Sequence, residues 1–305
     1  MPVRGTHEGI EHAAAPSDRH GRGGAVAGFD ARRTLPLPVE IRRQLTRRRT
    51  QLTLGFLVVL PFLLIAAFEL GGNDAGPGRE GRAPGLVDVA TAGAANFTLF
   101  TLFVSTGFLL VVVFALFAGD TVASEASWSS LRYLLAAPVP RAHLLRRKLV
   151  VALQFSFFAL VLLPVVAYGS GGLFFGWAPV RTPLGTTLPT GEALVRLGII
   201  VGYLALTLVF VSALAFLLGV WTDAPLGAVG GAVLLVNVSN ILDAVTALGD
   251  WREVLPTHYS YSWTDALGPD VVWDDMGRGA LWSLGYTLVL LTAAWWHFGR
   301  KDIVS

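Results

Sequence analysis

Six long apolar stretches, separated by polar segments, dominate the pattern of hydrophobic and polar positions along the chain. They cover residues 52–70, 95–118, 149–168, 193–220, 226–248 and 280–298. A helix needs about 20 apolar residues to cross a bilayer. None of the stretches shows the polar alternation of a membrane-barrel strand. The pattern therefore predicts an all-α integral membrane protein whose main part, residues 52–305, contains six transmembrane helices.

The residues before the first apolar stretch divide into two parts. Residues 1–36 lack apolar periodicity and are rich in Gly, Ala, Arg and His, so we expect a disordered tail. In residues 37–51, Leu37, Ile41 and Leu45 recur every four positions and share one helical face. The remaining surface carries Arg42, Arg43, Arg47, Arg48 and Arg49. This pattern is typical of an interfacial helix whose arginines face anionic lipid headgroups. The adjoining span argues against nucleic-acid binding.

Composition and charge support a membrane protein and give it an orientation. Only 14% of the 305 residues are charged, against about 25% in soluble domains, which excludes an ordinary cytosolic enzyme. If the N-terminus is cytoplasmic, the inner segments hold 17 Lys and Arg residues and the outer segments hold 6. The positive-inside rule therefore predicts that both termini are cytoplasmic.

Polar residues recur at helical spacing in two predicted spans. They are Thr98, Thr101 and Ser105 in the second span, and Asn237, Asn240 and Asp243 in the fifth. Hydrogen bonds between helices explain such stripes. A shared translocation surface that must become hydrated during transport explains them equally well, because both interpretations need polar groups that face the bundle interior. Both interpretations stay open at this point.

Ionisable residues are nearly absent from the middle of the spans, since Glu69 and Arg196 lie at span ends and Asp243 in an outer part. A motor-independent secondary transporter keeps a coupling-ion site there, so the pattern disfavours one. The glycine pairs Gly198–Gly202 and Gly227–Gly231 favour close helix packing.

The predicted outer loop, residues 249–279, is acidic and rich in Trp and Tyr, which is typical of an interfacial or re-entrant element. His258 has no second histidine at ligand spacing, so we interpret it as ordinary and expect no metal site.

The segment between the second and third spans, residues 119–148, is the most informative part of the sequence. Trp128, Leu131 and Leu135 recur at steps of three and four, which predicts a short amphipathic helix. Pro138 and Pro140 end that helix. Its apolar face needs a cover, either the membrane surface or the groove of a partner protein.

This segment resembles the cytoplasmic loop of the type-2 class of ATP-binding cassette (ABC) transporter permeases. In that class the loop reads Glu, three polar or basic residues, Gly-Thr-Leu, a Leu pair, Pro, Arg and finally Lys. The matching positions here are Glu125, Ser129, Ser130, Leu131, Leu134, Leu135, Pro138, Arg141 and Lys148. The ending Phe298-Gly299-Arg300-Lys301-Asp302 is similar to the tail of the class. Ser129-Ser130 replaces Gly-Thr, and Ala126 and Trp128 replace basic residues.

The resemblance implies a permease subunit that docks onto a separate nucleotide-binding subunit, which holds ATP and Mg. It implies two permeases, either identical copies or paralogues, with two ATPases in a prokaryotic plasma membrane. ATP hydrolysis would move the 120–135 helix and drive alternating access through the second and fifth spans. The expected ATPase contacts are polar at Glu125, Arg132 and Arg141 and apolar at Trp128 and Leu131; solvation or lipid phosphates are the alternatives for the charged residues.

The chain carries no sign of being its own motor. A phosphate-binding P-loop needs Lys followed by Ser or Thr, whereas Leu149 follows Lys148 and Asp302 follows Lys301. We therefore expect no enzyme activity and no cofactor on this chain. The mostly apolar spans suit export of a hydrophobic or amphipathic substrate. The alternatives are a motor-independent secondary transporter and a membrane anchor or assembly factor.

Overall fold

The computed structural model describes residues 37–71, 86–127, 141–181 and 187–300, and they are almost entirely helical. The helices are α1 (Leu37–Leu45), α2 (Arg48–Gly71), α3 (Leu86–Ala90), α4 (Ala94–Thr106), α5 (Leu109–Ser127), α7 (Arg141–Phe175), α8 (Thr190–Thr222), α9 (Pro225–Asp243) and α10 (Asp274–Arg300). Two 3₁₀ helices, η2 (Thr246–Val254) and η3 (Ser262–Leu267), lie between α9 and α10. The strands β1 (Val180–Arg181) and β2 (Thr187–Leu188) pair antiparallel in a small hairpin.

The six predicted spans all fall on apolar helices of sufficient length. Five of them are α2, α7, α8, α9 and α10, and the bent pair α4 and α5 makes the sixth. The chain is therefore an all-α membrane protein, as the apolar pattern predicts. Two spans differ in detail from the prediction. The second is broken near Gly107, with a bend of 59°. The fifth ends at Asp243 rather than at residue 248, and the 3₁₀ helix η2 follows.

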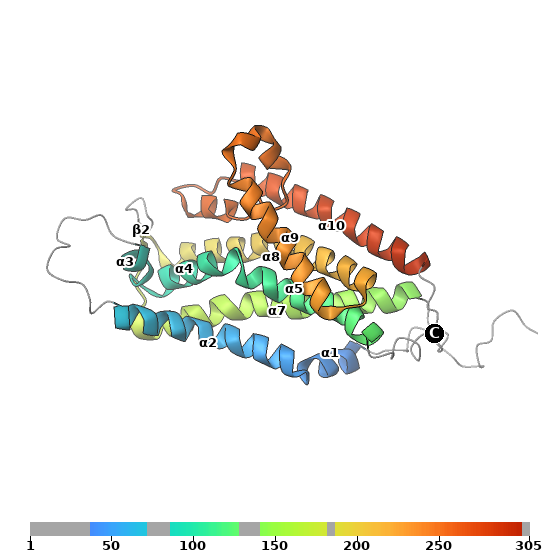
Figure 1. Cartoon of the computed structure of the whole chain (residues 1–305). Coiled ribbons are helices and arrows are strands. Elements are labelled where there is room, and N and C mark those ends of the chain that lie inside the picture. The colour runs from blue at the N-terminus through green and yellow to red at the C-terminus, as the bar shows by residue number, and fades with distance from the viewer. Residues whose placement is uncertain (1–36, 72–85, 128–140, 182–186, 301–305) are drawn as a thin grey trace, which may run out of the picture.

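Helix α8 lies at the centre of the bundle and packs against α5, α9 and α10, while α7 packs against α2, α4 and α5. Figure 1 shows α2, α7, α5 and α8 running alongside one another, with α9 inclined across α5 and α8. Large apolar side chains such as Phe114, Leu160 and Phe216 are fully buried in this core. Helix α2 stands at the edge, and much of its apolar surface, including Leu52 and Leu63, is exposed, as suits contact with lipid.

A glycine allows the closest helix crossing in the core. A Cβ atom added at Gly219 of α8 would lie 2.6 Å from the carbonyl oxygen of Gly119 in α5. This contact leaves no room for a side chain, so only glycine permits the approach. In contrast, a Cβ atom at Gly198 or Gly202 would meet no atom within 4 Å. Within the described residues, Gly198 and Gly202 therefore do not mediate the close helix packing that we expected of this pair.

The bundle has two ends, which we name by their residues. At the Asp120 end, α5 and α8 finish, α7 begins, and α1 and the last turns of α10 lie close by (Figure 1). At the hairpin end, the side chain of Asn96 joins the hairpin to α4. Its Nδ2 donates to the carbonyl oxygen of Arg181 at 2.7 Å, and the Arg181 amide donates to its Oδ1 at 2.9 Å. This pairing satisfies backbone groups in the same way as another strand would.

Candidate functional site

A set of charged and polar side chains joins four helices at the Asp120 end, and we call it the Asp120 cluster. Its members are Glu40 of α1, Arg47 just before α2, Arg49 in the first turn of α2, Asp120, Thr121 and Ser124 of α5, and Lys148 of α7. Asp120 is only 3% exposed. Its carboxylate accepts a hydrogen bond from Arg47 Nη1 at 2.7 Å and another from Arg49 Nη1. Because both arginines pair with it, their positive charges balance the negative charge of the buried carboxylate.

Lys148 forms the second half of the Asp120 cluster. It is also only 3% exposed, and its Nζ donates to the carbonyl oxygen of Thr121 at 3.3 Å. The same Nζ lies 4.0 Å from Oε1 of Glu40, which also accepts a hydrogen bond from Arg43 at 2.9 Å. The lysine therefore links α7 to α5 and to α1.

The Asp120 cluster offsets an unfavourable local arrangement. Arg48 and Arg49 begin α2, where the partial positive charge of the helix dipole disfavours cations. The carboxylate of Asp120 supplies the missing negative charge from another helix. The cluster also lies on the two helices that border residues 128–140 in the sequence, because Asp120 lies seven residues before the end of α5 and Lys148 seven residues after the start of α7. The helices that flank this segment are thus joined to each other and to α1 and α2.

The structure changes the interpretation of the basic N-terminal helix. The helix ends at Leu45, and Arg48 and Arg49 already belong to α2. Arg47 and Arg49 contact Asp120, and Arg43 contacts Glu40, so these three have protein partners rather than lipid alone. Headgroup contact remains the prediction for the exposed Arg42 and Arg48. On the predicted apolar face, Ile41 packs against the core, whereas Leu45 is 46% exposed.

The residues predicted to contact an ATPase lie next to the Asp120 cluster along the chain. Glu125 is in the last turns of α5, and Arg141 is the first residue of α7. The side chains of both lie outside the described residues. Trp128, Leu131 and Arg132 fall in residues 128–140 and are outside them altogether. Sequence reasoning missed Asp120 itself, although a lone carboxylate directly after an apolar stretch was a usable signal.

The polar stripe of the second span is buried but does not meet the stripe of the fifth. Thr98, Thr101 and Ser105 are each at most 1% exposed. The two threonine hydroxyls donate to carbonyl oxygens one turn earlier in α4, both at 2.8 Å. Helix α4 packs mainly on α7, whereas α9 packs on α5 and α8. These threonines bond within their own helix rather than to another helix, so the hydrogen bonds between helices that we expected at these two positions are not formed.

The three polar residues of the fifth span have three different surroundings. Asn237 donates to the Val233 carbonyl oxygen of its own helix at 2.8 Å. Asn240 faces a small cavity beside the break in the second span. Asp243 contacts Nδ1 of His258 at 2.5 Å. The isolation of His258 in the sequence suggested that it has no particular role. The structure gives it one, because it joins the end of α9 to the loop that follows.

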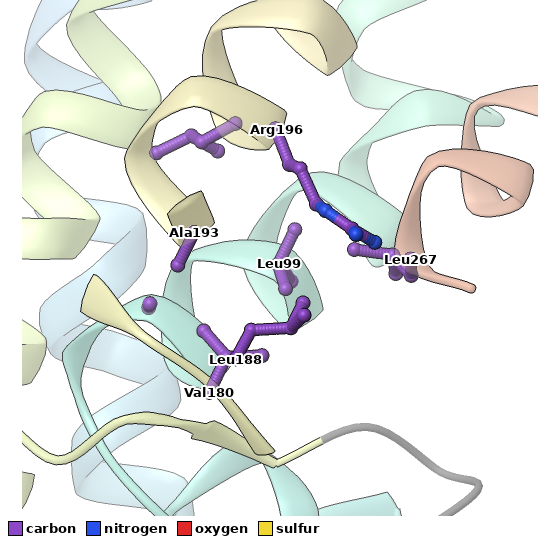
Figure 2. A pocket seen from close by; sticks show the side chains of 8 residues that line it. Leu99, Val180, Leu188, Ala193, Arg196 and Leu267 are labelled. Atoms are coloured by element: carbon purple, nitrogen blue, oxygen red, sulfur yellow. The ribbon is translucent and has the colours of Figure 1, made fainter. Parts of the chain in front are cut away.

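Arg196 holds the predicted outer loop onto α8. It is 5% exposed and points toward Leu267 (Figure 2). Its guanidinium donates to the carbonyl oxygens of Ala266 at 3.0 Å and Pro269 at 2.8 Å, and also to that of Gly268. Ala266 lies in the last turn of η3 and the other two residues directly follow the helix, so the arginine acts as a C-terminal cap.

Burial also shifts the titration of groups in this loop. Burial raises the pKa of the Asp265 carboxyl, and the nearby carboxylate of Asp275 raises it further. Burial likewise raises the pKa of the Tyr261 hydroxyl. The described residues contain no group of three or more His, Asp or Glu side chains placed to hold a metal ion.

Comparison with known families places most of the chain in a described family. The model of a family described as a protein of unknown function, DUF2705, matches residues 87–304, more than two thirds of the chain. The match covers Asp120 and Lys148 but not Glu40, Arg47 or Arg49, so the Asp120 cluster joins the matched region to α1 and α2. A comparison with curated proteins gives no significant match.

Proposed function

Because the chain belongs to the DUF2705 family, whose description names no activity, we propose its function from the arrangement of its residues. It is the membrane permease subunit of an ABC transporter. It exports a hydrophobic or amphipathic substrate across a prokaryotic plasma membrane by alternating access. A separate nucleotide-binding subunit supplies the energy by hydrolysing ATP.

The Asp120 cluster is the observation that carries this proposal. A partner can drive a membrane protein only if the segment it pushes is firmly attached to the helices that must move. Residues 128–140 emerge from α5 and enter α7, and the Asp120 cluster joins these two helices to α1 and α2 beside that segment. Force applied there reaches four helices together, because the paired charges are costly to separate away from water.

Helix packing gives the push a route through the bundle. Helix α5 meets α8 at the tight Gly119–Gly219 crossing, and α9 packs on both helices. A shift of α5 therefore changes the packing of α8 and α9, since close-packed interfaces move as units rather than deform. The second and fifth spans are thus the ones that we propose to move.

The distribution of charge supports an orientation for the proposal. The described helices place α1 and the end of α10 at the same end of the bundle, as an even number of spans requires (Figure 1). The positive-inside bias assigns that end to the cytoplasm. The exposed Arg42 and Arg48 would then face anionic lipid of the inner leaflet.

The assembly that follows from the proposal contains two permeases and two ATPases. The second permease is another copy of this chain or a paralogue. ATP and Mg bind to the ATPase subunits and not to this chain, which lacks a P-loop. The scarcity of charge within the spans favours an uncharged or amphipathic cargo, because a buried ion without a counter-charge is costly.

Co-purification tests the proposal. The chain, tagged and expressed in its own host, should recover an ABC ATPase in a mild detergent, and the reconstituted complex should transport only with ATP. Glu125→Arg should reduce that recovery and leave membrane insertion intact. Asp250→Arg is the matched control, because Asp250 is an exposed acid in the loop between α9 and α10. Equal recovery from both variants removes Glu125 from the interface. If the reconstituted chain transports without an ATPase, it is a secondary transporter. If it does not transport at all, it is an anchor or assembly factor.

Labelling with a membrane-impermeant maleimide tests the orientation separately. The natural chain has no cysteine, so single introduced cysteines report without background. Trp128→Cys should be labelled only after the membrane is opened, whereas Asp250→Cys should be labelled on intact cells. The opposite result would overturn the orientation and, with it, the ATPase docking site.

A further inference from the structure

The break in the second span borders a small cavity whose lining combines polar and apolar groups. The cavity has a volume of about 20 Å³, which is room for about one water molecule. It lies between the end of α4, the start of α5, α8, α9 and the loop that follows α9. Its polar lining consists of Thr106, Thr207, Asn240, Thr257 and Ser260, with Gly107 at the break itself.

The hydrogen bonds of the lining leave acceptors and a donor for an additional group. The Thr106 hydroxyl donates to the Leu102 carbonyl oxygen at 2.7 Å, and the Thr207 hydroxyl donates to the Tyr203 carbonyl oxygen at 3.1 Å. Each hydroxyl proton is therefore used, while oxygen lone pairs remain. The side-chain amide of Asn240 makes no hydrogen bond with any residue that the structure describes. The Asn240 amide can donate a hydrogen bond to a bound oxygen atom. The hydroxyl proton on that oxygen can in turn be accepted by the Thr106 or Thr207 oxygen.

The broken helix adds a second reason for a polar occupant. A helix that ends inside an apolar region frees its last carbonyls and the first amides of the next helix. These groups need partners when lipid surrounds the protein, because no bulk water reaches them. The Tyr261 hydroxyl reaches Gly107, where a Cβ atom would lie only 2.6 Å from it. A bound oxygen in the cavity would lie beside the same break.

The charge of the lining decides the class of occupant. Among the residues that the structure describes, no Asp, Glu, Lys, Arg or His lines the cavity. Asp243, one turn beyond Asn240 on α9, is already paired with His258. A cation would therefore lack a counter-charge, whereas a neutral hydroxyl group finds both donors and acceptors.

We infer that this cavity is a binding site for one hydroxyl oxygen, supplied by a water molecule or by the alcohol group of a molecule that enters from the membrane. The occupied site completes the hydrogen bonding of Asn240 and connects α4, α8 and α9 at the bend. The inference does not depend on an ATPase partner or on transport.

Hydroxyl-radical labelling by an X-ray pulse tests the site in the purified full chain in lipid nanodiscs, because a bound water generates radicals in place. Phe210 and Leu208, which line the cavity and are 5% exposed, should be labelled. Phe114 and Phe216, which are fully buried away from it, should not. Absence of labelling at Phe210 and Leu208 in the natural chain would overturn the inference.

Two variants and one control connect the labelling to the cavity. Asn240→Leu should reduce labelling at Phe210 to the level of Phe114, and so should Thr207→Val, which keeps the side-chain volume in case the first variant does not fold. Asn237→Leu is the matched control, because Asn237 bonds within its own helix and does not line the cavity. If the control loses as much labelling at Phe210 as the two cavity variants do, the loss is not specific to the cavity, and the site is refuted.

Competition with small molecules distinguishes the two sources of the hydroxyl group. In the natural chain, 1-octanol should reduce labelling at Phe210 relative to n-octane if an alcohol can replace the water. Unchanged labelling in both solutions supports a site that binds water alone. Equal reduction by octanol and octane would refute hydroxyl recognition, because the alkane offers only apolar surface.

Discussion

The pairing of Asp120 with Arg47 makes a quantitative prediction about the stability of the bundle. Replacing Asp120 with Asn keeps the shape of the side chain and removes its charge. The variant should lose stability because Arg47 and Arg49 then face a neutral amide instead of a carboxylate. A double-mutant cycle with Arg47→Gln isolates this one interaction from other effects of each substitution.

The magnitude follows from the exposure of the partners. Asp120 is 3% exposed. The side chain of Arg47 is 22% exposed and that of Arg49 is 44% exposed. A buried hydrogen bond to a charged group contributes about 1.5–3 kcal/mol, whereas a solvent-exposed pair contributes about 0–1 kcal/mol. We therefore expect a coupling of about 2 kcal/mol between Asp120 and Arg47 and below about 1 kcal/mol between Asp120 and Arg49.

Unfolding in mixed micelles of dodecyl maltoside and sodium dodecyl sulfate, followed by tryptophan fluorescence, measures these free energies. The chain has nine tryptophans, so it needs no added label. Asp275 and Arg278 provide the control cycle, because they also form an ion pair but are 55% and 62% exposed and stand 3.9 Å apart. Their coupling should be close to zero. A coupling of Asp120 to Arg47 below about 0.5 kcal/mol, the usual error of such cycles, would refute the reasoning.

Three further predictions address other parts of the fold. Gly219→Ala should destabilise the bundle by about 1–3 kcal/mol through overpacking against α5, whereas Gly202→Ala, with no atom within 4 Å of its added Cβ, should be neutral or stabilising in the same unfolding assay. Arg196→Lys should speed hydrogen exchange over residues 262–270, because a compact ammonium lacks the planar fork with which the guanidinium reaches three carbonyls at once; unchanged exchange would contradict the role of Arg196 as a cap. The raised pKa of Asp265 means that the folded loop binds its proton more tightly than the unfolded chain, so loop stability should fall as pH rises from about 4. Asp265→Asn should remove this dependence, and a hydrogen-exchange profile that is already flat with pH in the natural chain would contradict it.

The sequence predicted the spans because each depends on about 20 consecutive residues. The apolar runs inside α2, α7, α8 and α10 carry that information locally, and tertiary contacts do not alter it. The break at Gly107 is different. Its apolar surroundings predict a continuous helix, and the reason for glycine there is Tyr261, more than 150 residues later in the chain. No local pattern contains that contact.

The arginines of the N-terminal region show the same limit from the opposite direction. A helical pattern alone places Arg47 and Arg49 on a solvated basic face, because their partner Asp120 is 73 and 71 residues away. The structure brings the three together, and the apolar neighbourhood that buries Asp120 makes the pairing strong. Removal of the carboxylate would leave two guanidinium groups at the positive end of α2, which the helix dipole disfavours. The ion pairs that attach the start of α2 to α5 therefore depend on one acid, and a motion of α5 that carries Asp120 should move the start of α2 with it.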